Sequence, residues 1–401
     1  MEKTIVKPKV QHELEFAFGQ EYGLEEAEAL MQCLKERAPS CGKKVKEFED
    51  AFATYTGSNF ALSLTSATTG LKLAGIAVGV QAGDEVITTP ISWISTATAF
   101  SELGAKIVFC DVDPFTLNLD PIHLEHLITS KTKAIVPVHL YGQCCKMDEI
   151  MKIAQKHKIA VIEDCSHNPG GTYLGKPAGT WGDIGIFSFQ QQKNISTLGE
   201  GGMAITNNKS LFDSILSYRS LCCRIYGGSE KYLAIDEEKY PMDNEYWKLY
   251  FDDIGFNYRM TDAQATVGIQ QLKKLDNFNN KRKEIADYIR TGLKGIKGLT
   301  LPYEDPNGTH VYHIFMIQIE KEFPMSKRDF MYELYFNKGI KVWSHYMPIH
   351  LTHPYLNQGH FVGECAIAEA AYQKYVSLPI HPRLAKAGLD YLIQSIKELA
   401  A

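Results

Sequence analysis

The feature that most constrains the fold of this chain is an alternation of strand-like and helix-like runs in its first half. Three short apolar runs are predicted to be buried strands: KIVFCDV (106–112), KAIVPVHLYG (133–142) and IAVIEDC (159–165). Between the last two lies MDEIMKIAQKHK (147–158), whose apolar residues recur at helical spacing. A strand, a helix and a strand in this order form a βαβ unit and require a mainly parallel sheet. The sequence therefore predicts an α/β fold, with ligands bound beyond the carboxyl ends of the strands.

The length of 401 residues indicates two domains. A long helix is expected at about 261–293, and we place the domain boundary inside it, near residue 280. Residues 1–280 would form a large domain with a mainly parallel central sheet flanked by helices. Residues 281–401 would form a smaller α+β domain, and the first ~25 residues of the chain would pack against it.

Two other segments of the sequence carry expectations of their own. The stretch 218–253 is acidic and rich in Tyr, with no clear period. Because long irregular insertions are more often functional than not, it predicts either a loop that covers a cleft or a decoration at the surface or a subunit interface. The stretch SKRDFMYELYFNKGI (326–340) predicts a helix with an apolar face formed by Phe330, Leu334 and Phe336.

Composition and charge exclude several classes of protein. Hydrophobic residues make up 45% of the chain and charged residues 22%, the balance of a soluble globular protein. A net charge of −5 gives no reason to expect nucleic acid or an anionic membrane as a partner. No apolar run approaches the roughly 20 residues of a membrane span, and the N-terminus has no signal-peptide core. The nine cysteines form neither a disulfide framework nor a metal-binding spacing, so we expect a cytoplasmic protein without a metal.

The stretch LTSATTGLKLAGIAVG (64–79) places hydroxylated residues at the start of a predicted apolar helix. Free N–H groups at a helix N-terminus, with hydroxyls such as those of Thr68 and Thr69, can bind an anion. The alternative is an ordinary N-cap, where Ser and Thr are favoured in any case. Ser188, at the end of another apolar run, offers a further hydroxyl to the same anion.

Three more residues complete a set that one cofactor would use. Trp93 follows a predicted strand and could stack on a flat ring, Asp164 ends the strand VIED, and Lys193 precedes the glycine-rich turn GEGG. Each has a common structural explanation: a core tryptophan, a capping carboxylate and a solvated lysine. Together with an anion site they are the parts that pyridoxal phosphate (PLP) needs, namely a reactive amine, a carboxylate for the ring nitrogen, a stacking ring and phosphate donors.

Nearly the whole chain resembles one family. Its motifs are similar to those of the DegT/DnrJ/EryC1/StrS sugar aminotransferases, which are fold type I PLP enzymes. The matching stretches are FEDAFATYTGSNFALSLTSATTGL (48–71), AGDEVITTPISWISTATA (82–99), VIEDCSHNPGGTYLGKPAGTWGDIGIFSFQQQKNISTLGEGG (161–202), IGFNYRMTDAQATVGIQQLKKL (254–275), HYMPIHLTHPY (345–355) and VSLPIHPRL (376–384).

The resemblance implies a role for each residue around the cofactor ring. Lys193 would form the aldimine with PLP and then carry protons during the reaction. Asp164 would pair with the pyridine nitrogen, and Trp93 would stack on the ring. His167, where many members have glutamine, would contact the 3-oxygen of the ring.

The resemblance also implies a phosphate site that two subunits share. Thr68, Thr69 and Ser188 would hold the phosphate of PLP. Asn257 would reach the phosphate bound by the other subunit. The expected working unit is therefore a homodimer with shared active sites.

These roles imply a transamination in amino-sugar biosynthesis, from glutamate or glutamine to a keto sugar. The acceptor would be a nucleotide-linked keto sugar or a keto-cyclitol, and the glutamines of QQQK (190–193) favour the cyclitol slightly. Four residues are candidates to line an open polar cleft for it: Arg224, Tyr226, His345 and Tyr346.

Two alternatives remain open from the sequence. The sugar dehydratase branch of the family removes a hydroxyl group and carries histidine in place of the aldimine lysine, so Lys193 argues against it. The other alternative is a non-catalytic sensor or scaffold that keeps the fold. The presence of Lys193, Asp164 and the phosphate residues argues against that alternative.

Overall fold

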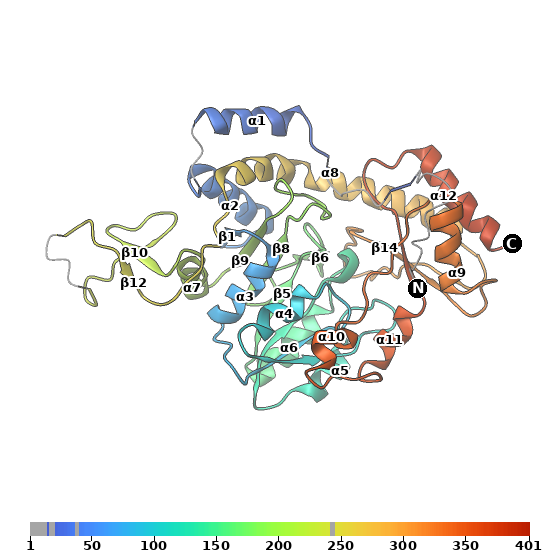
Figure 1. The fold of residues 1–401 in the computed structure, drawn as a ribbon, viewed down its shortest axis with the longest axis horizontal. Helices are drawn as coiled ribbons and strands as arrows, with labels where there is room; N and C mark the ends of the chain where they lie inside the picture. Colours follow the sequence, from blue (N-terminus) through green and yellow to red (C-terminus); the bar gives the residue numbers. More distant parts are fainter. Residues whose placement is uncertain (1–13, 16–20, 37–39, 241–244) are drawn as a thin grey trace, which may run out of the picture.

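A seven-stranded sheet forms the centre of the computed structural model, which describes residues 14–15, 21–36, 40–240 and 245–401 (Figure 1). The strand order is β1-β9-β8-β5-β4-β2-β3, and all of these strands except β9 run in one direction. The predicted, mainly parallel sheet is therefore confirmed. Its strands are β1 (Phe60–Leu64), β2 (Glu85–Thr88), β3 (Lys106–Phe109), β4 (Thr132–Val136), β5 (Ala160–Asp164), β8 (Ile184–Ser188) and β9 (Gly202–Thr206).

Helices cover both faces of this sheet (Figure 1). Neighbouring residues of one strand enter different hydrophobic clusters, as Val86 and Ile87 do, and both are fully buried. Burial on both faces explains why the strands appear in the sequence as continuous apolar runs. The helices of this part are α1 (Leu24–Lys35), α2 (Lys43–Thr56), α3 (Ala67–Ala77), α4 (Ser95–Ser101), α5 (Pro121–Leu127), α6 (Met147–His157), α7 (Lys209–Arg219) and the N-terminal half of α8 (Asp262–Leu293).

The strand predicted over 133–142 is shorter than expected. It ends at Val136, and the chain then passes through Pro137 into a 3₁₀ turn, η1 (Leu140–Gly142). Gly142 has a φ of +107°, and a Cβ atom there would lie 2.9 Å from the backbone nitrogen of Tyr312. The turn is therefore set by a close approach of distant backbone, which local periodicity does not encode.

The C-terminal part of the chain builds a second, smaller unit around its own hydrophobic cluster. The cluster joins the second half of α8 to an antiparallel sheet, and Leu14 from the start of the chain packs into it. The predicted boundary near residue 280 falls inside α8 and stays a prediction. The elements here are β13 (Leu299–Thr300), β14 (Phe315–Ile319), β15 (Tyr375–Leu378), α9 (Lys327–Tyr332), η2 (Glu333–Asn337) and α12 (Lys386–Leu399).

Two details of this part differ from the simple sequence pattern. The helix predicted over 326–340 is a short α9 followed by a π-helical turn, η2, with Phe330 and Leu334 fully buried and Phe336 only partly buried. The elements between β14 and β15 also include η3 (Ile349–Leu351), α10 (His353–Leu356) and α11 (Ala366–Tyr372). Side chains of these three elements join the core of the large sheet, so the chain returns to the first unit before it ends.

The irregular stretch 218–253 forms an arm that projects beyond α7 and away from the sheet (Figure 1). Short strands β10 (Cys223–Ile225), β11 (Leu233–Ala234) and β12 (Tyr250–Phe251) make a small sheet in it. Residues 241–244 lie outside the described part. A second small hairpin, β6 (Thr172–Tyr173) and β7 (Lys176–Pro177), lies between β5 and β8 in the chain.

All nine cysteines fall in the described part of the chain, where they are buried and form no disulfide. None of the helices in the described ranges has the length and apolar character to cross a membrane.

A buried ion pair ties α7 to α2 and β1, and it predicts a large effect on stability. Arg219 is fully buried and donates to the Glu49 carboxylate over 2.6 Å and to the Ser63 carbonyl over 3.0 Å. Arg219→Met leaves the Glu49 charge buried without its cation, so the free energy of unfolding should fall by roughly 3–5 kcal/mol. Urea denaturation of the cofactor-free protein measures it.

The exposed pair of Lys386 and Asp390, whose charged atoms lie 2.7 Å apart, provides the control. Lys386→Met should leave the free energy of unfolding close to that of wild type, because solvent screens an exposed ion pair. If the free energy of unfolding fell equally in Arg219→Met and Lys386→Met, the stabilising role assigned to Arg219 would be contradicted.

Candidate active site

The predicted site residues lie at one edge of the large sheet because the parallel strands end there. Asp164 is the last residue of β5 and Ser188 is the last of β8. Leu64 and Ser188 both pair with Gly202, so the ends of β1 and β8 and the start of β9 lie at one level. The loops after these strands therefore converge, as expected for a parallel sheet.

Asp164 is 3% exposed, and other protein groups hold its carboxylate. Oδ2 accepts a hydrogen bond from the Thr96 hydroxyl over 2.8 Å, and Oδ1 accepts one from the backbone N–H of Ser166 over 3.1 Å. The Thr96 hydroxyl lies 2.8 Å from that of Ser92. The carboxylate thus has a fixed orientation at the sheet edge.

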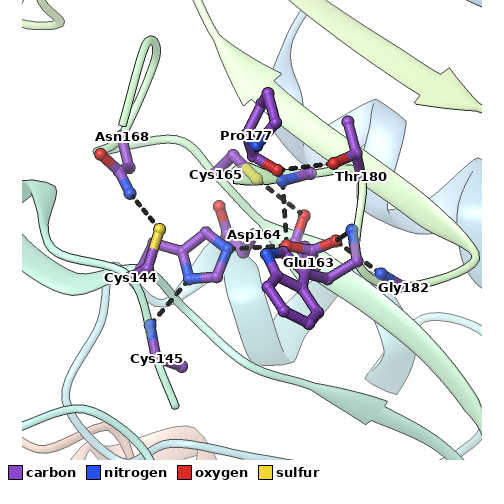
Figure 2. Close-up of polar contacts among 12 residues, drawn as sticks. Cys144, Cys145, Glu163, Asp164, Cys165, Asn168, Pro177, Thr180 and Gly182 are labelled. Atoms are coloured by element: carbon purple, nitrogen blue, oxygen red, sulfur yellow. Dashed lines mark hydrogen bonds and ion pairs between the residues drawn. The ribbon is translucent and has the colours of Figure 1, made fainter. Parts of the chain in front are cut away.

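Glu163, the other carboxylate of VIED, does not join the site. It is fully buried, and its oxygens accept hydrogen bonds from the backbone N–H groups of Gly179, Trp181 and Gly182 at 2.7–2.9 Å (Figure 2). The His139 ring nitrogen Nε2 lies 2.9 Å from it. Glu163 therefore lies apart from Asp164 although the two are neighbours, because successive side chains of β5 point to opposite faces of the sheet.

The same network contains the group of potential metal ligands found among the described residues, which are His139, Glu163 and Cys165, with ligand atoms within 4.8 Å of one another. Glu163 already accepts from three backbone N–H groups. Nδ1 of His139 accepts from the backbone N–H of Cys145 over 3.1 Å, so Nε2 carries the proton that reaches Glu163. These bonds account for the group as a structural network (Figure 2).

Lys193 lies in the turn between β8 and β9. Burial lowers the pKa of its amine to about 8, and the negative charges of Asp164 and Glu200 oppose that shift. The turn closes where Gly202 passes the start of α3, and a Cβ atom on Gly202 would lie 2.7 Å from the backbone nitrogen of Ala67. A side chain at Gly202, the last glycine of GEGG, would therefore collide with the start of α3.

The N-terminus of α3 offers anion donors at the same edge. Ser66 is the N-cap and accepts from the Thr69 N–H over 3.2 Å. The N–H groups that precede it at the start of the helix have no intrahelical acceptor and can meet an anion. The Thr68 hydroxyl donates to Ser95 over 2.9 Å, and the Thr69 hydroxyl donates to the Ser66 carbonyl over 2.8 Å. Ser188 accepts from the backbone N–H of residue 190 over 3.3 Å.

A group of rings covers the Asp164 side of the site. His167 is 2% exposed, and its Nε2 lies 3.2 Å from the Tyr346 hydroxyl. Trp93 is 61% exposed, with its ring 6.2 Å from that of Tyr346, and Nδ1 of His345 lies 3.0 Å from the Ser377 hydroxyl. Burial holds the pKa of His167 well below its usual range and lowers that of His345 to about 4, so both rings are neutral.

Three of the predicted residues make no hydrogen bond or ring contact with the other site residues in the described part of one chain. Arg224 and Tyr226 belong to the projecting arm, where Arg224 pairs with Asp252. Asn257 is exposed beyond α7, on a segment whose flanking residues Phe256 and Tyr258 stack with their ring centroids 4.8 Å apart. Because side chains alternate along an extended segment, Asn257 faces away from those two rings.

The residues present fit PLP. The buried carboxylate of Asp164 suits a protonated pyridine nitrogen, and the first turn of α3 suits a phosphate. Nδ1 of His167 is buried without a hydrogen-bond partner in the described part of the chain, as expected of an atom that meets a ligand.

Comparison with known proteins gives the same assignment. Residues 20–397 match the model of the DegT/DnrJ/EryC1/StrS aminotransferase family. The chain belongs to this family. It is 36% identical to the spore coat polysaccharide biosynthesis protein SpsC of Bacillus subtilis, over 94% of this chain and 95% of SpsC. It is 35% identical to the GDP-perosamine synthase of Caulobacter vibrioides, over 90% of this chain and 91% of that protein.

Among solved structures, the chain is similar to Spr1654 of Streptococcus pneumoniae in its PLP-form, with a TM-score of 0.86 and 25% identity over 96% of each chain or more. The fold is therefore the fold type I of PLP-dependent enzymes, as predicted. This DegT-family member is a PLP-dependent sugar aminotransferase of sugar biosynthesis.

Two residues of this aminotransferase site are absent from the sequence prediction. Thr96 lies within the quoted motif ISTATA, and its position one helical turn after Ser92 was the available signal. His313 contacts His167 but lies almost 150 residues later in the chain. No local pattern connects those two positions.

The lysine at the site leads to a prediction about titration. Burial lowers the pKa of both Lys193 and Lys327 to about 8, whereas ordinary lysines titrate near 10.4. In the cofactor-free protein, two lysine amines should therefore become neutral near pH 8. NMR titration of ¹³C-methylated lysines would follow them, and Lys193→Arg and Lys327→Arg should each remove one of the two signals. Titration of the Lys193 signal near 10 would contradict the desolvated site.

Proposed function

We propose that this aminotransferase transfers an amino group from glutamate or glutamine to a keto sugar, with Lys193 as the reactive amine. The observation that carries the proposal is the pairing, at one sheet edge, of a lysine whose pKa is lowered to about 8 with the buried, fixed carboxylate of Asp164. An amine with that pKa is neutral in an appreciable fraction at physiological pH, which a nucleophile and proton carrier requires.

Bound PLP would supply an electron sink for the carbon that gains or loses the amine. Asp164 would keep a proton on the ring nitrogen, and Thr96 would hold the carboxylate in the required orientation. Lys193, once free, would take a proton from one carbon and return it to another. Its low pKa supports both directions of that transfer.

We assign the remaining cofactor contacts by the same geometry. The first N–H groups of α3, with Thr68, Thr69 and Ser188, would hold the phosphate. Trp93, largely exposed, presents a ring face for stacking, and His167 would meet the 3-oxygen through its unpartnered Nδ1.

For the acceptor we favour a nucleotide-linked keto sugar over a keto-cyclitol. The relative from Caulobacter vibrioides is named GDP-perosamine synthase. The glutamines of QQQK (190–193) give little reason to favour a cyclitol, because the side-chain oxygen of Gln190 accepts a hydrogen bond from the backbone N–H of Gln192 over 2.7 Å. His345 and Tyr346 would contact the substrate beside His167.

We further propose a homodimer with shared active sites, working in the cytoplasm. The exposure of Asn257 supports a contact with the partner's phosphate site. The projecting arm would carry Arg224 and Tyr226 toward the partner's site, since it points away from the body of its own subunit. The unoxidised, buried cysteines fit a reducing compartment.

The experiment that tests the proposed function is an absorbance spectrum of the PLP-loaded protein before and after glutamate or glutamine. Wild type should lose its visible band with one of these donors and regain it with a nucleotide-linked keto sugar. Lys193→Ala should lose turnover by roughly 10²–10⁴-fold, because it removes the proton carrier. Asp164→Asn should keep the fold and lose roughly 10²–10³-fold in turnover, because the charge that stabilises the electron sink is gone.

A band that responds to neither donor would contradict the proposed donors. Release of a hydroxyl group in place of amine transfer would support the dehydratase alternative, and failure to bind PLP would support the scaffold. Undiminished turnover in Lys193→Ala would exclude Lys193 as the reactive amine.

Mixing two inactive variants tests the shared site. Subunits with Lys193→Ala and with Asn257→Ala, unfolded and refolded together, should regain activity. In a mixed dimer one site receives an intact Lys193 from one subunit and an intact Asn257 from the other. Each variant refolded alone is the control, and no recovery in the mixture would place Asn257 in the site of its own subunit.

A further inference from the structure

A second buried histidine lies against His167. The ring centroids of His313 and His167 are 4.5 Å apart, with 32° between the ring planes. His313 is 8% exposed, and its Nδ1 has no hydrogen-bond partner in the ranges that the structure describes. The contact between the two rings is therefore one of packing, with no hydrogen bond through either Nδ1.

The backbone that carries His313 is held by the two sides of the site. Asn194, the residue after Lys193, donates to the Val311 carbonyl over 3.2 Å. The backbone of η1 bonds the same segment twice, from Val311 N–H to the Gly142 carbonyl over 2.8 Å and from Ile314 N–H to the Tyr141 carbonyl over 3.2 Å. The lysine turn and the His313 segment are thus one connected unit.

A buried cation adds a third support from α8. Arg282 is 1% exposed and donates to the carbonyls of Tyr312 and His313 and to that of Ile380, at 2.7–3.4 Å. These bonds fix the peptide on both sides of His313. The backbone that carries the ring is therefore held by three separate elements of the fold.

The charges that face His313 all favour its neutral form. Burial is the main reason that its pKa lies well below the usual range. The cations near it, Lys193 and Arg282, would repel a proton on the ring, and the neighbouring rings of His167 and His345 are themselves neutral. A neutral ring can pack against His167 without repelling it.

We propose that His313 is a positioning residue, which fixes the ring of His167 by direct ring contact so that its unpartnered nitrogen points at the cofactor. The inference rests on the proposed function for the role of His167 at the 3-oxygen of PLP. His313 itself need touch neither cofactor nor substrate. A planar ring at this position is required, and its nitrogen atoms are not.

Three variants of His313 separate ring contact from polarity. His313→Phe keeps a ring, His313→Gln keeps polarity, and His313→Ala keeps neither. In the cofactor-free protein, NMR of ¹⁵N-labelled histidine rings should show one tautomer for His167 in wild type and in His313→Phe. It should show averaged or titrating signals in His313→Ala and His313→Gln. In the PLP-loaded protein, the pH midpoint of the visible band should move by about half a unit or more in these last two variants only.

His310→Ala is the matched control. His310 lies three residues away, stacks on Tyr312 with centroids 4.0 Å apart, and has no ring contact with His167 among those found in the described residues. It should leave the His167 signals and the pH midpoint unchanged.

A wild-type His167 spectrum in His313→Ala would overturn the inference. A wild-type His167 spectrum in His313→Gln but not in His313→Phe would also overturn the inference, because polarity at this position would then be the requirement. If His313→Ala does not fold, the His167 spectra of His313→Phe and His313→Gln still distinguish ring contact from polarity. The NMR measurement uses no cofactor, so failure of wild type to bind PLP would reject the proposed function without affecting this readout.

Discussion

Strand β5 delivers two neighbouring carboxylates to the end of the sheet, and side-chain alternation sends them to opposite faces. Glu163 accepts hydrogen bonds from three N–H groups of the 179–182 turn, and His139 approaches it from the end of β4. That buried network holds the loops that follow β4 and β5. Asp164, one residue on, is left at the edge with its carboxylate held by Thr96. The position of the Asp164 carboxylate therefore depends on the network around Glu163, because the two residues are neighbours on the same short strand.

The chemistry of Lys193 follows from the same edge. Its amine is desolvated enough to lower the pKa to about 8, although Asp164 and Glu200 favour the charged form. Desolvation therefore outweighs two carboxylates at the edge. The contact of Gly202 with the start of α3 fixes the far side of the lysine turn. The N-terminus of α3, proposed to hold the phosphate, and the amine of Lys193 are thereby held on the same side of the sheet edge.

The C-terminal part of the chain contacts the site in two ways, through backbone hydrogen bonds and through ring contacts. Asn194, η1 and Arg282 hold the segment 311–314 from three directions, and His313 reaches His167 from it. Tyr346 approaches His167 from a different loop of the same half of the chain. The arm behaves in the opposite way, since it leaves the body of the subunit and carries Arg224 and Tyr226 with it. One subunit therefore brings most of the proposed cofactor residues to one edge and sends its arm outward.

What the sequence determined by itself was local. The spacing of apolar residues predicts the parallel sheet and the helix over 147–158, and residue type at strand ends indicates Asp164, Ser188 and Lys193 as one group. The structure confirms the sheet and the helix, because periodicity and the direction of parallel strands act within a few residues or one βαβ unit.

Tertiary structure alone decided the rest. It turned Glu163 inward, ended the strand at Val136 where distant backbone approaches Gly142, and brought His313 to His167. It also carried the arm away from the body of the subunit. Each of these depends on contacts between segments far apart in the chain, whose geometry is set by packing and backbone hydrogen bonds. No pattern of neighbouring residues encodes such contacts.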